Sequence, residues 1–246
     1  MLLEIKNLKV KGNGRRPPTA REILKGINLQ IKQGDIQALL GPNGSGKTVL
    51  GQTILGNPKY KVTQGRIFFG GKEITKLAPE KRVKLGMALA FQSAPAIKGV
   101  KLIQLLEKIS QLPVKGLVKG EISDGKNLLE RDVNLDFSGG EKKMSELLQV
   151  LALNPKLVIF DEIDSGLDLK RLERVAKIIK KEFIDKKTSV LLITHSGAIL
   201  KFLKPQITNV MVQGKIICKE KDYRKVLRVI KRYGYEKCKK CKLLAN

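Results

Sequence analysis

The sequence predicts an α/β fold with a parallel sheet at its centre, and three observations support this prediction. Two continuous apolar runs, Leu157–Phe160 and Val190–Ile193, are typical of central parallel strands that are covered on both faces. A third apolar run, Ile36–Leu40, leads directly into a glycine-rich turn. Basic segments with helical periodicity, residues 169–186 and 222–233, are expected to supply covering helices.

An antiparallel unit is expected at the N-terminus and a helical region in the middle of the chain. Leu3–Ile5 and the alternating Ile27–Ile31 have the pattern of antiparallel strands, and Ile67–Phe69 is a further short strand between glycines. Glycines and prolines in Lys11–Arg21 indicate an exposed loop. The pattern becomes helical over Leu102–Asn134.

The length fits one large domain or two small lobes, and the composition is typical of a globular protein; we expect a single domain over residues 1–246 with a helical subdomain at about 93–145. Hydrophobic residues make up 42% of the chain and charged residues 29%. No apolar run approaches the roughly 18 residues of a membrane span, and Glu4 interrupts the start where a signal peptide is apolar. Three cysteines without a regular framework favour a reducing compartment. We therefore expect a cytoplasmic protein without direct membrane insertion.

The net charge of +26 has two interpretations. A basic surface can bind nucleic acid by releasing counterions, or it can be a lysine-rich surface such as heat-adapted proteins carry. The basic residues are dispersed and aromatic content is 4%, so stacking platforms for bases are scarce. We expect the basic tail, Lys215–Lys242, to face solvent or an acidic partner rather than nucleic acid.

Cys238 and Cys241 have CxxC spacing near the end of the chain. A closed metal site needs about four ligands, so two thiols are half a site. They are either ordinary thiols or part of a metal or cluster site shared across chains.

A glycine-rich turn follows the first parallel strand and precedes a segment with helical character, residues 48–56. It has the pattern G-x-x-x-x-G-K-[ST], and its residues are Gly41, Pro42, Asn43, Gly44, Ser45, Gly46, Lys47 and Thr48. Glycines let backbone N–H groups approach phosphate oxygens, and the helix N-terminus adds partial positive charge. We expect Lys47 to contact the β and γ phosphates of ATP and Thr48 to bind Mg²⁺.

Polar residues that suit phosphate hydrolysis follow three of the apolar runs. Asp161 and Glu162 come at the carboxyl end of a strand, where ligands bind in open α/β sheets. We expect Asp161 to hold Mg²⁺ through water, and Glu162 to orient and deprotonate the attacking water as general base. Gln92 is expected to contact the γ-phosphate through Mg²⁺ or water. His195, the chain's only histidine, should lie beside Glu162 and take part in catalysis.

A second glycine-containing turn, Phe137–Lys143, opens a later helix with Ser138, Gly139 and Gly140, which form a second anion-binding terminus. With the motifs above, in this order and spacing, it resembles the signature loop of ABC ATPases. The resemblance implies an ABC nucleotide-binding domain: a RecA-like P-loop core, an N-terminal antiparallel β subdomain and a short helical subdomain. It also implies that this loop caps ATP bound to a second copy. Asp168 follows the acidic strand closely enough to line the same cleft.

Within that family the chain resembles the SufC family, ATPases of iron–sulfur cluster assembly. Glu141 stands where transporters usually have Gln. Met144 departs from the family's usual Arg, and the segment between Gln92 and Ser138 is shorter than the family's. Four stretches carry the resemblance: residues 60–65 (YKVTQG), 90–92 (AFQ), 132–134 (DVN) with the signature loop, and 164–168 (DSGLD).

The resemblance implies Mg-dependent hydrolysis of ATP at the interface with a second copy of the chain, driving a conformational change in a SufB/SufD-like scaffold. An alternative is the ATP-binding subunit of a membrane ABC transporter. Residues 60–65 and Glu141 favour the scaffold over the transporter. A nucleic-acid-associated cassette is a third interpretation, motivated by charge, but the chain has neither a coiled-coil insertion nor a second cassette.

Overall fold

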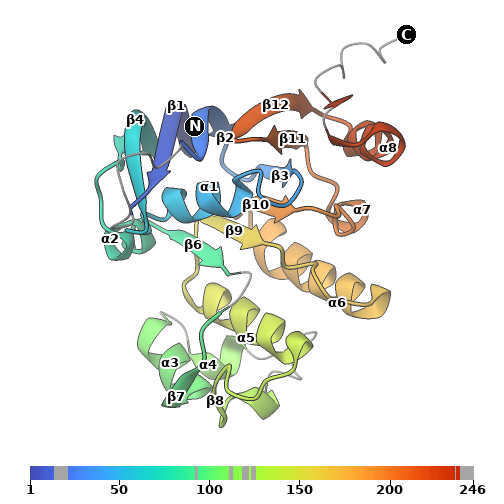
Figure 1. The fold of residues 1–246 in the computed structure, drawn as a ribbon. Helices are drawn as coiled ribbons and strands as arrows, with labels where there is room; N and C mark the ends of the chain where they lie inside the picture. Colours follow the sequence, from blue (N-terminus) through green and yellow to red (C-terminus); the bar gives the residue numbers. More distant parts are fainter. Residues whose placement is uncertain are drawn as a thin grey trace.

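A six-stranded sheet forms the centre of the fold, in the order β12-β11-β3-β10-β9-β6 (Figure 1). Five of its strands are parallel, and β12 (Lys215–Glu220) pairs antiparallel with β11. The parallel strands are β3 (Ile36–Leu40), β6 (Met87–Ala90), β9 (Leu157–Asp161), β10 (Ser189–Thr194) and β11 (Ile207–Val212). The computed structural model describes residues 1–13, 22–91, 94–110, 113–117, 122, 126–235 and 237–238.

The predicted parallel strands are confirmed, and their apolar runs serve two separate cores. Every residue of β3, β9 and β10 is buried. In β9, Val158 and Phe160 join one cluster while Leu157 and Ile159 join the other. Each fully buried side chain of this kind stabilises the fold by about 1.5–3 kcal/mol. A register shift would exchange the two faces, so burial on both sides fixes where each strand ends.

The N-terminal strands form a four-stranded antiparallel sheet in the order β2-β1-β4-β5, as predicted. Helix α1 (Lys47–Ile54) lies between this sheet and the parallel one, because Leu50 and Ile54 share a core cluster with both. The strands are longer than the sequence pattern indicated: β1 (Leu3–Gly12), β2 (Leu24–Ile31), β4 (Tyr60–Phe69) and β5 (Lys72–Glu73). Helix α2 (Pro79–Lys84) follows.

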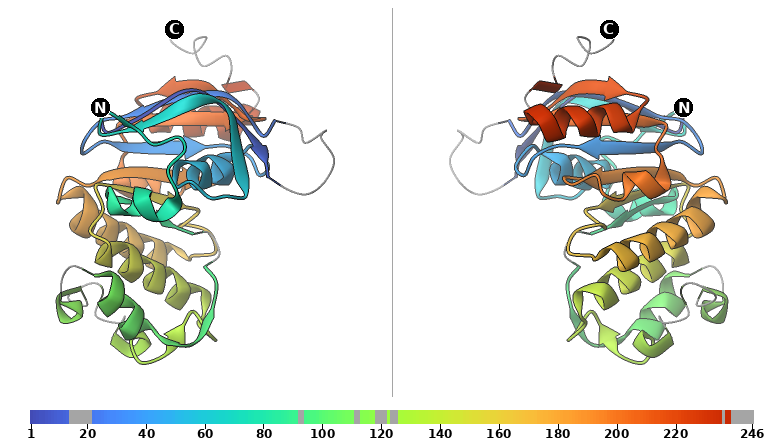
Figure 2. Two further views of the ribbon diagram at one scale, coloured as in Figure 1. Left: turned by 90° about the vertical axis from the view of Figure 1, so that its left-hand side faces the viewer. Right: turned by 90° about the vertical axis from the view of Figure 1, so that its right-hand side faces the viewer.

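The middle of the chain forms a separate, mainly helical part below the sheets (Figure 2). Its elements are β7 (Ile97–Lys101), α3 (Leu102–Ile109), α4 (Val114–Leu117), β8 (Asp132–Val133) and α5 (Gly139–Ala152). The β7–β8 pair was not predicted, because β7 is almost wholly exposed and carries two lysines in five residues. The boundaries at about 93–145 stay a prediction.

The C-terminal helices pack on the face of the parallel sheet opposite to α1. The predicted basic helices are confirmed, although the first ends in a π-helical turn, Lys180–Ile184. The helices are α6 (Leu169–Ile179), α7 (Leu200–Leu203) and α8 (Tyr223–Tyr233). Within the described residues, no helix combines the length and apolar character needed to cross a membrane.

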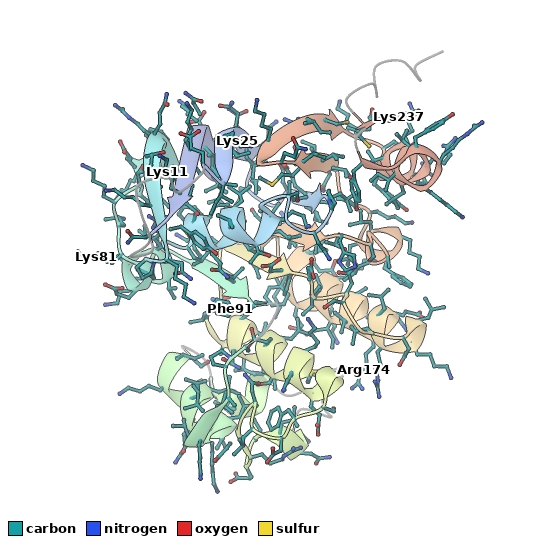
Figure 3. All side chains as sticks on the ribbon, in the orientation of Figure 1. Lys11, Lys25, Lys81, Phe91, Arg174 and Lys237 are labelled. Atoms are coloured by element: carbon teal, nitrogen blue, oxygen red, sulfur yellow. The ribbon has the colours of Figure 1, made fainter. Side chains whose placement is uncertain are left out.

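The basic side chains are spread over the surface, as predicted from their dispersal in the sequence. In Figure 3, Lys11, Lys25 and Lys81 lie around the N-terminal strands and α2, and Lys237 lies at the opposite end, beyond α8. Gln92, Cys241 and residues 14–21 of the predicted loop lie outside the described residues.

Candidate functional site

The phosphate loop (residues 41–48) connects β3 to α1, in the structural setting that the sequence predicted. Gly46 precedes α1 with φ of 103°, a backbone conformation that favours glycine, and no side chain caps the helix. At Gly41 a Cβ atom would lie 2.3 Å from the carbonyl oxygen of Met211, so a side chain is excluded. Ser45 is buried, and its hydroxyl has no hydrogen-bond partner in the described part of the chain. Uncapped N–H groups and an unsatisfied hydroxyl suit an anion.

Lys47 is held inside this loop. Its side chain is 4% exposed, and Nζ donates hydrogen bonds to the carbonyl oxygens of Gly41 (2.8 Å) and Pro42 (3.0 Å). Burial lowers the pKa of Lys47, while the nearby Glu162 and Asp161 carboxylates act in the opposite direction. A buried ammonium held by two carbonyl groups can exchange them for phosphate oxygens at little cost in side-chain entropy.

Thr48 and Asp161 come together from α1 and the end of β9. Thr48 Oγ1 donates a hydrogen bond to Asp161 Oδ1 across 3.2 Å. Burial raises the pKa of Asp161 to about 6. Both side chains offer hard oxygen donors, which Mg²⁺ prefers, either directly or through its bound waters. The two residues therefore fit Mg²⁺, whereas Gln92, the third expected ligand, lies outside the described residues.

Glu162 and His195 are neighbours, as the sequence predicted. His195 Nδ1 lies 3.4 Å from Glu162 Oε1 at the ends of β10 and β9. Glu162 is 7% exposed and has φ of 53°, a left-handed conformation that costs a non-glycine residue about 1–2 kcal/mol. Backbone hydrogen bonds hold it there. Its N–H donates to the carbonyl of Ile193, and its own carbonyl accepts from Lys143 Nζ (3.0 Å) and from both the N–H (3.0 Å) and the Oγ (2.8 Å) of Ser165.

The signature loop (residues 137–143) presents its serine and first glycine to the surface. Ser138 is the N-cap of α5, where its hydroxyl accepts from the N–H of Glu141. The Glu141 carboxylate accepts in return from the N–H of Ser138 (2.7 Å) and pairs with Arg131 (2.7 Å). Accepting the Ser138 N–H is the main reason that the pKa of Glu141 is lowered. A Cβ atom at Gly139 would meet nothing within 4 Å, so the helix terminus is open to a ligand from outside.

Asp168 and Gly140 both lie near Arg171, and neither contacts Glu162 or His195 in the described contacts. Asp168 is the N-cap of α6, and its carboxylate accepts from the N–H of Arg171 (2.9 Å). At Gly140, a Cβ atom would come within 3.8 Å of the Arg171 side chain.

Three buried residues near the site were not predicted. Asp164 Oδ2 accepts hydrogen bonds from Thr194 (2.7 Å) and Ser196 (2.8 Å), which flank His195. Lys143 and Glu146, three residues apart on α5, are the other two. The only sequence signal was the presence of charges on the apolar face of a helix, which does not identify their partners.

Glu146 links α5 to the strand that ends before Gln92. Its Oε2 accepts from the N–H of Phe91 (3.0 Å), and burial raises the pKa of Glu146. Phe91 lies where the sheet meets the helical part (Figure 3). Lys143, on the same helix, contacts the backbone of Glu162. Helix α5 therefore contacts the backbone of the predicted base and of Phe91, the residue before Gln92.

Comparisons with known proteins agree with this geometry. The family model described as ABC transporter matches residues 24–165. The chain is similar to the probable ATP-dependent transporter ycf16 of Cyanophora paradoxa, at 40% identity over 88% of this chain and 87% of that protein. Vegetative protein 296 of Bacillus subtilis is 37% identical over 87% of this chain and 85% of its own length.

Solved structures share the fold. A nucleotide-free ATP-binding cassette from an ABC transporter has a TM-score of 0.75 at 23% identity, covering 96% of this chain and 98% of that one. A dimeric cassette in a post-hydrolysis state bound to ADP and Pi has a TM-score of 0.72 at 21% identity, covering 89% and 98%. This chain therefore belongs to the ABC transporter ATP-binding family, and it is a cassette that binds and hydrolyses ATP.

Proposed function

We propose that this cassette is the ATPase of an iron–sulfur cluster assembly complex, in which ATP closes two copies of the chain and moves a SufB/SufD-like scaffold. One observation carries the dimeric part of the proposal. The phosphate loop and the buried acids lie on the sheet core, while Ser138 and Gly139 are exposed at the N-terminus of a different helix. Each copy thus offers two half-sites, and a second copy completes both.

In this proposal the core half-site does the chemistry. Lys47 and the phosphate loop bind the β and γ phosphates, and Glu162 takes the proton of the attacking water. His195, 3.4 Å from Glu162, keeps that carboxylate in place. Thr48 and Asp161, with Gln92, hold Mg²⁺, which when bound offsets negative charge on the phosphates.

The signature half-site completes the enclosure. Ser138, Gly139 and Gly140 meet the γ-phosphate of the ATP on the other copy, and α5 directs its positive terminus at the phosphate. Asp168 follows Glu162 by six residues and lies at the border between the two copies. Closure follows from ligand that fits only the closed pair.

Similarity in four stretches supports the scaffold partner, above all residues 60–65 and Glu141 in the signature loop. Glu141 is also structurally used, because it forms both the capping box and the pair with Arg131. The strongly basic surface suits acidic faces on the scaffold and speeds encounter. We place the complex in the cytoplasm, without direct membrane insertion and without nucleic acid.

A second candidate function is the ATP-binding subunit of a membrane transporter. The names of the relatives favour it, since ycf16 of Cyanophora paradoxa is called a probable ATP-dependent transporter. The same ATPase chemistry serves both functions, so only the partner separates them.

Affinity isolation from native lysate under anaerobic conditions tests the proposal. We expect a non-membrane partner that carries iron and acid-labile sulfide. Recovery of a polytopic membrane protein in its place would establish the second candidate. Dimerisation is tested on the purified chain, where turnover per subunit should rise with protein concentration. Turnover independent of concentration down to the nanomolar range would refute the two-copy site.

A further inference from the structure

The C-terminal helix α8 and Tyr235, which follows it, each contact the loop that carries His195 at one point. The first is apolar: a Cβ atom at Gly197 would lie 2.7 Å from Leu227 Cδ2, so the leucine packs closely on the loop. The second is polar: the Tyr235 hydroxyl donates a hydrogen bond to the backbone carbonyl oxygen of His195. These contacts join the end of the described chain to a residue at the candidate site.

Tyr235 is held firmly enough to act as an anchor. Helix α8 packs Val226 and Val229 into the core, and it ends at Gly234, whose φ of 74° lets the chain turn back. Tyr235 then packs against the same core cluster as Cys238, which is 1% exposed. Burial raises the pKa of Tyr235 to about 12, so the phenol keeps its proton and remains a donor at neutral pH.

The residues on either side of His195 are fixed from the opposite direction. Thr194 and Ser196 both donate to the buried carboxylate of Asp164, and the N–H of Gly197 donates to Thr194 Oγ1 (3.0 Å). His195 itself points its imidazole at Glu162. The Tyr235 contact therefore holds the peptide group of the residue whose imidazole lies beside the candidate base.

We propose that Tyr235 is a positioning residue for ATP hydrolysis: its hydroxyl fixes the His195 peptide group so that the imidazole stays beside Glu162. The proposal rests on the catalytic roles of Glu162 and His195 proposed above. Removing the hydroxyl frees rotation about the His195 backbone and widens the range of imidazole positions. The loss affects the chemical step, because the phosphate loop that binds ATP makes no contact with Tyr235 in the described structure.

Tyr235→Phe tests this, because it removes one oxygen atom and keeps the packed ring. We expect kcat to fall about 3- to 10-fold, the usual worth of one hydrogen bond, with KM and the Kd for ATP unchanged within about twofold. Tyr233→Phe is the matched control, since Tyr233 is two residues away and 41% exposed. Its kcat should equal that of the unmodified protein.

A double variant identifies the route of the effect. In a His195→Ala background, Tyr235→Phe should cause no further loss of kcat, because the group that it positions is already absent. An additive loss would overturn the proposal. So would a wild-type kcat for Tyr235→Phe, or a joint change in KM and melting temperature, which would mark a general structural role.

The variant Glu162→Gln, assayed in parallel, separates this proposal from the proposed function. If Glu162→Gln retains turnover, the assignment of the base fails whatever Tyr235→Phe does. If Glu162→Gln is inactive and Tyr235→Phe has normal kcat, only the positioning role fails.

Discussion

The site residues on the sheet core, around the phosphate loop, and those in the signature loop are held in different ways. We call these two groups the phosphate-loop side and the signature side. On the first, Lys47 and Glu162 are 4% and 7% exposed; carbonyl groups of its own loop hold Lys47, and contacts from β10 and α5 hold Glu162. On the second, Ser138 and Gly139 are exposed, and the serine is paired with Glu141 of its own first turn. The difference fits the proposed arrangement, in which the chemistry is organised within one subunit and the signature loop faces the phosphates bound to another.

The largest effect is expected on the phosphate-loop side, from removing the carboxylate of Glu162, the proposed base. Glu162→Gln should lower kcat by about 10²–10⁴-fold, the usual contribution of a general base, while calorimetry shows unchanged ATP affinity. Glu107→Gln, at an exposed position on α3, is the control. Turnover near that of the unmodified chain would show that the buried side does not carry the chemistry.

Lys47→Ala asks whether the same side also binds the nucleotide. Losing a charge-assisted contact to phosphate should weaken the Kd for ATP by about 10- to 150-fold, measured by calorimetry. Lys84→Ala, at an exposed position on α2, is the matched control. An unchanged Kd would contradict the phosphate-site assignment.

Asp161→Asn tests the stability cost of the buried site. The pKa of Asp161 is raised to about 6 in the folded state, above its ordinary value of 3.8. The stability that its proton contributes is therefore complete below about pH 4 and lost as pH rises to about 6. The amide cannot ionise, so at pH 7 without nucleotide the variant should be more stable by about 1–3 kcal/mol.

Denaturant unfolding at pH 4 and pH 7 measures this effect. The gain from Asp161→Asn should shrink at the lower pH, and exposed Asp185→Asn should show neither effect. Equal stability of Asp161→Asn and the unmodified chain at pH 7 would show that burial of this carboxylate is not costly.

The smallest effect is expected on the signature side, where Glu141→Ala should change stability but not nucleotide binding. It removes the capping box and the Arg131 pair, and should reduce the free energy of unfolding by about 0.5–2 kcal/mol. ATP affinity of the isolated subunit should not change. Lys142→Ala, at the next and exposed position, is the control. A weakened Kd for ATP would mean that the two sides are not separate within one subunit.

The sequence allowed most of the core to be predicted because continuous apolar runs can only be buried strands here. It also predicted which residues meet at the site, since Lys47, Asp161 and His195 each follow or lead a strand whose end is fixed. It could not predict the β7–β8 pair, which has almost no buried side. Nor could it predict Asp164, because that buried acid is defined by partners 30 and 32 residues away.

Helix α5, which begins in the signature loop, links the two sites in the proposed pair of subunits. Ser138 is its N-cap. One to two turns later, Lys143 donates a hydrogen bond to the backbone of Glu162, and Glu146 accepts one from the backbone of Phe91. In the proposed pair, the 14 residues of this helix connect the neighbour's nucleotide at its N-terminus to the loops of its own active centre. We therefore propose that occupancy of one site affects the other, and we expect the rate to depend sigmoidally on ATP concentration.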